Sequence, residues 1–147
     1  MPEEYFRPLP VRYPEDIEHL DGAIEHRLRI PRCRTCGRSF WPSGPVCPYD
    51  FSREIEWSTD SGNGVITSWV RYHKQYFAGG DDVPYYVVQA ELKSGPRLTT
   101  SWSAVVAPTI GMSVGVAFRQ FGESVYLPEF TPLDDQTTNA QMSKDYE

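Results

Sequence analysis

Hydrophobic and polar residues alternate along most of the chain between residues 54 and 130. This alternation is typical of β-strands that bury one face. Clusters of Gly, Pro, Asn, Asp and Ser interrupt it at regular intervals and indicate turns. The pattern predicts six short strands, over residues 54–58, 65–74, 84–92, 97–103, 112–120 and 125–130. Five or six short strands that close on themselves protect their edges, so we expect a small antiparallel barrel, best described as an OB-fold.

Two details of this pattern give specific expectations. In the strand 65–74, Ile66, Val70 and Tyr72 share one face, and Thr67, Trp69 and Arg71 share the other. In the later strands, the inward residues are expected to be Tyr86, Val88, Ala90 and Leu92, followed by Val114, Val116 and Phe118. The run Ser61-Gly62-Asn63-Gly64 tolerates positive φ, and we interpret it as a hairpin turn.

The pattern before residue 54 is different. Pro2, Pro8, Pro10 and Pro14 forbid a regular helix and predict an extended arm over residues 1–14. From Glu15 onward a helical period appears at Ile17, Leu20 and Ile24, and Gly22 is expected to end or bend this helix. We therefore expect an arm at 1–14, a helix with a small ribbon at 15–52, the barrel at 53–131, and a polar, disordered tail at 132–147.

The ribbon is predicted from cysteine spacing. Cys33 and Cys36 form a C-x-x-C-G knuckle, in which a tight turn points two thiolates at one metal ion. A second knuckle begins at Cys47-Pro48, but Asp50 stands where a fourth cysteine is expected. Zinc also accepts carboxylate oxygen, so Cys33, Cys36, Cys47 and Asp50 are candidate ligands of a rubredoxin-like zinc ribbon. The alternative is a metal-free ribbon held by Phe40, Trp41 and Val46.

Composition limits the class of protein. The chain has 147 residues, enough for one average domain or two small ones. Its three cysteines all belong to the predicted ribbon, which leaves no disulfide framework. We find no signal peptide and no long apolar run, and therefore expect a cytoplasmic protein with no membrane partner.

Charge is unevenly distributed. The formal net charge of −6 disfavours a general nucleic-acid binder, because phosphate neutralisation needs a basic face. However, five arginines follow one another with no acidic residue between them, namely Arg27, Arg29, Arg32, Arg34 and Arg38. They form either a solvated edge or an anion-binding patch for a phosphate-rich cofactor or an acidic partner.

Catalytic motifs are scarce. The sequence lacks a G-x-S-x-G elbow, a phosphate-binding G-x-x-x-x-G-K and a dinucleotide-binding G-x-G-x-x-G. His19 and His26 are expected at the surface or at a helix end. His73 lies in the predicted barrel and would act as a base, with Asp81 or Asp82, only in an alternative in which the chain is itself an enzyme.

Several short sequence motifs resemble those of the acyl-CoA-associated zinc-ribbon and OB-fold proteins. The resemblance covers about residues 15–132 and is carried by 28–37, Phe40-Trp41-Pro42, Val46-Cys47-Pro48, Glu56-Trp57, 61–66, 83–88, Glu91-Leu92, 95–98 and 110–114. It implies a non-catalytic accessory subunit of a thiolase-like protein or a hydratase, in Claisen, retro-aldol or acyl-transfer chemistry such as steroid side-chain degradation. The ribbon and helix would dock on the partner, and the barrel would lie near the acyl-CoA entrance.

The residues themselves agree with this resemblance at the arginine edge. Guanidinium groups bind phosphate bidentately, so Arg27, Arg29, Arg32 and Arg34 are candidate contacts for the phosphates of a coenzyme A thioester shared with the partner. The alternative function is single-stranded nucleic-acid binding, since OB-folds stack bases on aromatic side chains. The acidic net charge argues against it.

Overall fold

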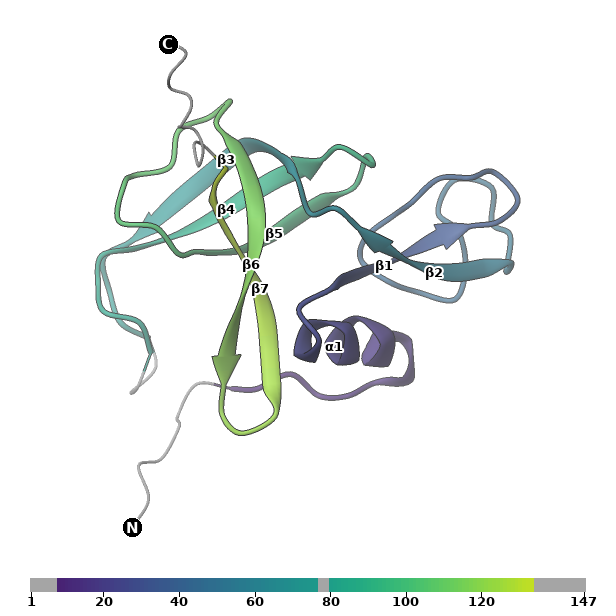
Figure 1. Cartoon of the computed structure of the whole chain (residues 1–147), viewed down its shortest axis with the longest axis horizontal. Helices are drawn as coiled ribbons and strands as arrows, with labels where there is room; N and C mark the ends of the chain where they lie inside the picture. Colours follow the sequence, from purple (N-terminus) through teal and green to yellow (C-terminus); the bar gives the residue numbers. More distant parts are fainter. Residues whose placement is uncertain (1–7, 77–79, 134–147) are drawn as a thin grey trace.

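The computed structural model describes residues 8–76 and 80–133, and contains a short helix, a two-stranded ribbon and a five-stranded barrel (Figure 1). The mainly β fold predicted from the sequence is confirmed. A 3-10 turn at Pro14–Asp16 precedes helix α1 (Ile17–Ile24). The strands are β1 (Leu28–Cys33), β2 (Ile55–Asp60), β3 (Gly64–Tyr72), β4 (Tyr85–Leu92), β5 (Arg97–Trp102), β6 (Ser113–Phe121) and β7 (Val125–Pro132). None of the described helices has the length and apolar character needed to cross a membrane.

The barrel closes in the order β3-β4-β5-β7-β6, with β6 returning to β3. All neighbouring pairs are antiparallel except β5 and β7, which run parallel at Ser101↔Glu129 and Trp102↔Phe130. The predicted antiparallel barrel is therefore wrong in this one pair. The reason is geometric, because strand directions cannot alternate all the way around a ring with an odd number of strands.

The core fills the inside of this barrel. On β4, Val88, Ala90 and Leu92 are buried as their alternation predicts. Phe130 on β7 is fully buried, and Trp102 packs in the same cluster. The cluster also takes in two residues of β1, Leu28 and Ile30, so the ribbon and the barrel share one hydrophobic core.

The expected faces of β3 are wrong after Ile66. A β-bulge shifts the register between Ile66 and Ser68, and one extra residue reverses which side chains point inward. The register then pairs Trp69 with the inward-facing Val88, although Trp69 is still 41% exposed, and Val70 is 51% exposed. The extra residue is Thr67, whose hydroxyl donates a hydrogen bond to the carbonyl of Gln89 across the strands.

The strand expected at 54–58 exists, but it belongs to the ribbon. β2 pairs with β1 along its whole length, from Cys33↔Ile55 to Leu28↔Asp60. By strand pairing, the barrel therefore begins at Gly64 and not at residue 53. The Ser61-Gly62-Asn63-Gly64 run connects the two sheets, so its interpretation as a hairpin turn is wrong. Gly64 is required there, because a Cβ atom would lie 2.4 Å from the Glu91 carbonyl oxygen.

Helix α1 lies between the ribbon and the barrel and packs on β1 and β7 (Figure 1). Its buried face carries His19, Leu20 and Ala23, whereas Ile17 and Ile24 are exposed, in contrast to the predicted stripe. Gly22 lies inside the helix. Its role is close packing, since a Cβ atom there would meet the Arg29 side chain at 2.3 Å.

One further contact joins the end of the helix to the barrel, and another joins the helix to the arm. The ring of His26, just beyond the helix, stacks on Phe118 with 5.6 Å between ring centroids. The described part of the arm, residues 8–13, has no regular structure and crosses the β6–β7 hairpin near its turn (Figure 1). Arg12 in this arm pairs with Asp21 of α1 at 2.8 Å. The predictions for residues 1–7 and for the tail after residue 133 lie outside the described residues.

His19 is buried, although the sequence suggested a surface position. Its Nδ1 lies 3.1 Å from the Arg29 carbonyl oxygen and therefore donates to it, which fixes the tautomer. Its ring lies 4.5 Å from that of Trp41. Burial lowers the pKa of His19 below its ordinary value of 6.5, and the Arg29 carbonyl and Asp16 offset this only in part. The helix therefore packs on the ribbon through a neutral imidazole.

This burial predicts a pH dependence of stability. The folded state binds fewer protons at His19 than the unfolded state does, so the free energy of unfolding should fall as pH drops below about 6.5. His19→Gln keeps a donor for the Arg29 carbonyl but does not titrate. In urea denaturation between pH 7.5 and 5, the wild type should lose more stability than the variant. Parallel losses in the two proteins would show that His19 is not responsible.

Candidate metal centre

The first knuckle begins where β1 ends. Cys33 is the last residue of β1, and its carbonyl accepts a 2.8 Å hydrogen bond from the Gly37 amide. The Cys36 amide points at the Cys33 sulfur at 3.4 Å. Gly37 has φ +82, a conformation that favours glycine. The sequence C-x-x-C-G therefore forms the tight turn expected of a zinc knuckle.

The second knuckle repeats this geometry without a second glycine. The Phe51 amide donates to the Cys47 carbonyl at 2.9 Å, and the Tyr49 amide points at the Cys47 sulfur at 3.3 Å. Phe51 takes the place of Gly37 and adopts φ +62. Asp50 occupies the position that matches Cys36. The turn thus presents a carboxylate where the first knuckle presents a thiol.

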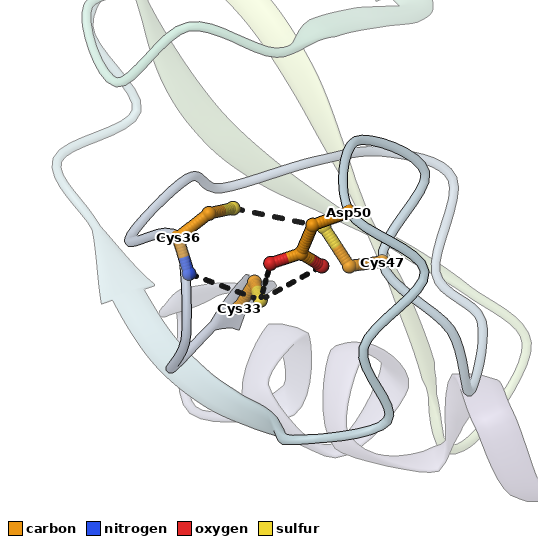
Figure 2. Close-up of side chains that lie close together, drawn as sticks. All are labelled: Cys33, Cys36, Cys47 and Asp50. Atoms are coloured by element: carbon orange, nitrogen blue, oxygen red, sulfur yellow. Dashed lines mark hydrogen bonds between the residues drawn. The ribbon is translucent and has the colours of Figure 1, made fainter.

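The four predicted ligands meet at one point (Figure 2). Their donor atoms all lie within 4.8 Å of one another. The sulfurs of Cys36 and Cys47 are 3.7 Å apart, and the Cys33 sulfur lies 3.6 Å from both Asp50 oxygens. Tetrahedral zinc with ordinary bond lengths requires about 3.8 Å between sulfurs and about 3.5 Å between sulfur and oxygen. The donor set and its spacing therefore fit zinc.

Electrostatics at the site differ between the donors. The Ser52 amide donates to Asp50 at 2.9 Å, which lowers the pKa of this carboxyl below its usual range despite some desolvation. Burial raises the pKa of the Cys33 thiol, but amide hydrogen bonds from Cys36 and Thr35 outweigh it, and the net pKa is lowered. Burial raises the pKa of Cys47. Asp50 is thus ionised at neutral pH and ready to bind a cation.

The arginine edge is largely paired with acids. Glu18 and Glu25, from the helical segment, pair with Arg29 at 3.1 Å and Arg27 at 2.6 Å. Glu56 of β2 lies 2.9 Å from Arg32 and 3.9 Å from Arg34. The sequence suggested an uncompensated edge because the partners of Arg29, Arg32 and Arg34 are distant along the chain. Apart from Arg29, which is 24% exposed, these side chains are 40–64% exposed, so the pairs of Arg27, Arg32 and Arg34 each contribute little to stability, about 0–1 kcal/mol.

A second ion-pair network in the barrel was missed by sequence reasoning. Arg119 on β6 donates to the carboxylates of Asp81 at 2.5 Å and Glu129 at 3.0 Å. Glu129 is only 4% exposed, and Asp81 comes from the β3–β4 loop. The hydrogen bond to Asp81 is the main influence on the pKa of Arg119 and raises it above its ordinary value. Burial lowers this pKa by less, and the hydrogen bond to Glu129 raises it further. The network ties the loop to the barrel wall.

Comparison with known proteins identifies both parts of the chain. Residues 20–56 match the ChsH2 rubredoxin-like zinc ribbon domain, and residues 57–119 match the ChsH2 C-terminal OB-fold domain. The chain belongs to the ChsH2 family. The resemblance to acyl-CoA-associated zinc-ribbon and OB-fold proteins is thereby confirmed. The two family matches meet within β2, close to the sheet boundary seen in the structure.

Two relatives with assigned names extend the comparison. A probable enoyl-CoA hydratase alpha subunit from Thermomonospora curvata is 30% identical over 133 residues, which is 88% of this chain and 41% of that protein. The chain thus spans about two fifths of that relative's length. A DUF35 domain-containing scaffold protein from Methanocaldococcus jannaschii is 27% identical over 113 residues, covering 71% of this chain and 80% of that protein.

Solved structures give the same architecture. A structure described as the Ltp2-ChsH2(DUF35) aldolase superposes with a TM-score of 0.76 and 29% identity, covering 84% of this chain and 98% of that one. A DUF35-family protein of unknown function from Sulfolobus solfataricus gives a TM-score of 0.57 at 16% identity over 81% of this chain and 85% of that one. This second likeness shows the fold alone.

Proposed function

We propose that this chain is a non-catalytic accessory subunit that binds an enzyme subunit and helps form its acyl-CoA site. The observation that carries the proposal is the match to a chain of the structure described as the Ltp2-ChsH2(DUF35) aldolase, over 98% of the length of that chain. That protein is named as a pair, and the other relatives are named as a hydratase subunit and a scaffold. The partner would be thiolase-like or hydratase-like, acting in retro-aldol, Claisen or acyl-transfer chemistry such as steroid side-chain degradation.

One loop on the surface of the barrel is suited to contact with a partner. The connector between β5 and β6 exposes three apolar side chains, with Val105 fully exposed, Val106 at 55% and Ile110 at 65%. Exposed apolar residues that gather in this way mark interaction sites more often than free surface. A loop of this kind suits contact with a protein or with the acyl chain of a thioester.

The arginine edge keeps its proposed role in binding coenzyme A. Exposed ion pairs are weak, and a phosphate that binds a guanidinium bidentately can replace the carboxylate partner. Arg27 and Arg34 are the most exposed of the four candidates, with side chains 55% and 64% exposed. We propose that Arg27, Arg29, Arg32 and Arg34 face the phosphates of an acyl-CoA held by the complex.

We also propose that Cys33, Cys36, Cys47 and Asp50 bind one zinc ion. The ion would join the two knuckles and so hold the ribbon together; its role would be structural. Cys33 and Cys47 are fully buried, while Cys36 and Asp50 lie toward the solvent. The exposed carboxylate makes this site weaker than a site with four thiolates, because zinc binds sulfur more tightly at such positions.

Asp50 variants test this assignment. Asp50→Ala should lower zinc affinity at least roughly tenfold, because one of four ligands is lost, and Asp50→Cys should raise it by a similar factor. Competition with a chromophoric chelator measures both affinities, with Ser52→Ala as a nearby control that keeps all four ligands. A wild type without zinc beside an Asp50→Cys variant with one equivalent would show instead that the ribbon has lost its metal.

Affinity purification from native cells tests the partner. The tagged full chain should recover one enzyme subunit in a stoichiometric amount, identified by mass spectrometry as thiolase-like or hydratase-like. Nucleic acid or ribosomal proteins in its place would favour the alternative function. A monomer with no enzyme subunit would overturn the proposal.

A further inference from the structure

Phe51 has an unfavourable backbone conformation and an exposed ring. Its φ is +62, in the left-handed region where a bulky side chain is strained. The matching residue of the first knuckle is Gly37, with φ +82. The Phe51 side chain is 77% exposed, so little of its ring is buried within the chain. Glycine at this position would form the same turn at lower conformational cost.

The knuckle itself imposes this conformation. The Phe51 amide donates to the Cys47 carbonyl at 2.9 Å, and the Cys47 amide donates to the Ser52 carbonyl at 2.8 Å. The Ser52 amide in turn donates to the Asp50 carboxylate at 2.9 Å. The surrounding hydrogen bonds therefore overdetermine the backbone, as is typical of strained residues that serve a function. The ring is held outward on a rigid turn.

The neighbouring side chains are aromatic and basic. Tyr49 is 51% exposed, and the guanidinium of Arg38 lies 4.5 Å over its ring. Arg34 is paired with Glu56 at 3.9 Å, but between residues 35 and 53 the chain still carries two arginines, Arg38 and Arg53, and a single aspartate, although its overall net charge is −6. That aspartate, Asp50, points at the cysteine sulfurs. We call Arg38, Tyr49 and Phe51 the ribbon tip, a basic and aromatic surface on an acidic protein.

We propose that the ribbon tip is a docking surface for the enzyme subunit, with Phe51 as its anchor. The complementary site is an apolar pocket that takes the ring of Phe51 and is rimmed by carboxylates that pair with Arg38. Aromatic residues and arginine dominate binding energy at protein interfaces, and a rigid anchor loses little entropy on binding. This inference rests on the proposed function, since it assigns a residue to the contact with that partner.

Phe51→Gly separates docking from folding. The enzyme subunit that co-purifies with the wild-type chain is expressed alone, and its affinity for purified chains is measured by biolayer interferometry. Phe51→Gly should weaken binding about 30-fold, as expected for an anchor. It should keep its zinc, and its Tm should be unchanged or rise by up to about 3 °C because the strain is relieved.

Two further variants define the surface. Arg38→Glu should weaken binding roughly tenfold and reduce its dependence on salt, because a rim charge is reversed. Val70→Ser removes an exposed apolar side chain from strand β3 of the barrel and should change the affinity less than about twofold, which separates loss of the anchor from loss of any exposed hydrophobic residue.

The other possible results of these measurements would contradict the inference, and each would do so in a different way. If the subunit binds Phe51→Gly as tightly as the wild type, the ribbon tip is not the docking surface, and the proposed function stands. If no enzyme subunit is recovered, both fail. A Tm lower by more than a few degrees would give the ring a structural role. Binding of a short single-stranded oligonucleotide that Phe51→Gly abolishes would make the tip a nucleic-acid site.

Discussion

Cys47→Ser should abolish zinc binding and unfold the ribbon. Cys47 is fully buried at the centre of the second knuckle, and three ligands that include an exposed carboxylate hold zinc poorly. Structural zinc contributes an apparent binding free energy of about 10–16 kcal/mol in small ribbons and fingers, and most of it is folding free energy. Metal analysis of the purified chain should fall from one equivalent to near zero. Hydrogen exchange should become fast in β1 and β2.

The barrel provides the internal control for this variant. Amides of β4 and β6 should stay protected, because eight of the ten buried residues of the shared core come from the barrel strands and stay packed against one another. A chelator should reproduce the loss of protection in the wild type. Slow exchange in β1 and β2 of the metal-free variant would show instead that packing of Phe40 and Trp41 holds the ribbon without zinc.

Arg119→Met should destabilise the barrel by about 2–3 kcal/mol. The variant keeps the aliphatic volume but leaves the Glu129 carboxylate, whose side chain is 6% exposed, without its charged partner. Breaking a buried pair typically costs about 3–5 kcal/mol. We expect less because the Arg119 side chain is 40% exposed and solvent screens the pair. Urea denaturation measures the free energy of unfolding.

Glu129→Gln is the matched variant for Arg119→Met. A neutral amide tolerates the loss of the guanidinium, so the double variant should recover part of the stability lost in Arg119→Met. The coupling free energy from the double-mutant cycle then reports the pair itself. Equal stability of Arg119→Met and the wild type would contradict a buried, charge-dependent network.

Hydrophobic alternation and cysteine spacing correctly predicted the features that are set by residues close together in the sequence. Alternation placed β4 and β6 with the correct inward residues, because neither strand carries a bulge of its own. The knuckle spacing predicted that Cys33, Cys36, Cys47 and Asp50 would meet, because each tight turn fixes two of them. The family resemblance added the order of ribbon and barrel.

Features that depend on distant partners were not predictable in this way. The bulge at Thr67 reverses the faces of β3, and its sequence carries no glycine or proline to mark it. The choice of β1 as the partner of β2 is set by tertiary pairing, as alternation shows a strand but not its neighbour. Likewise, Glu56 pairs with Arg32 across the ribbon, 24 residues away, and the positive φ of Phe51 appears only in the structure.

The measurement that tests the central claim most directly is turnover of an acyl-CoA by the enzyme subunit with and without this chain. The subunit identified by co-purification and the chain are purified separately and mixed at increasing ratios. We predict that the chain alone has no activity, and that turnover or acyl-CoA affinity of the subunit rises until one chain is bound per site. Turnover by the chain alone, or full activity and acyl-CoA affinity of the subunit without it, would contradict an accessory role.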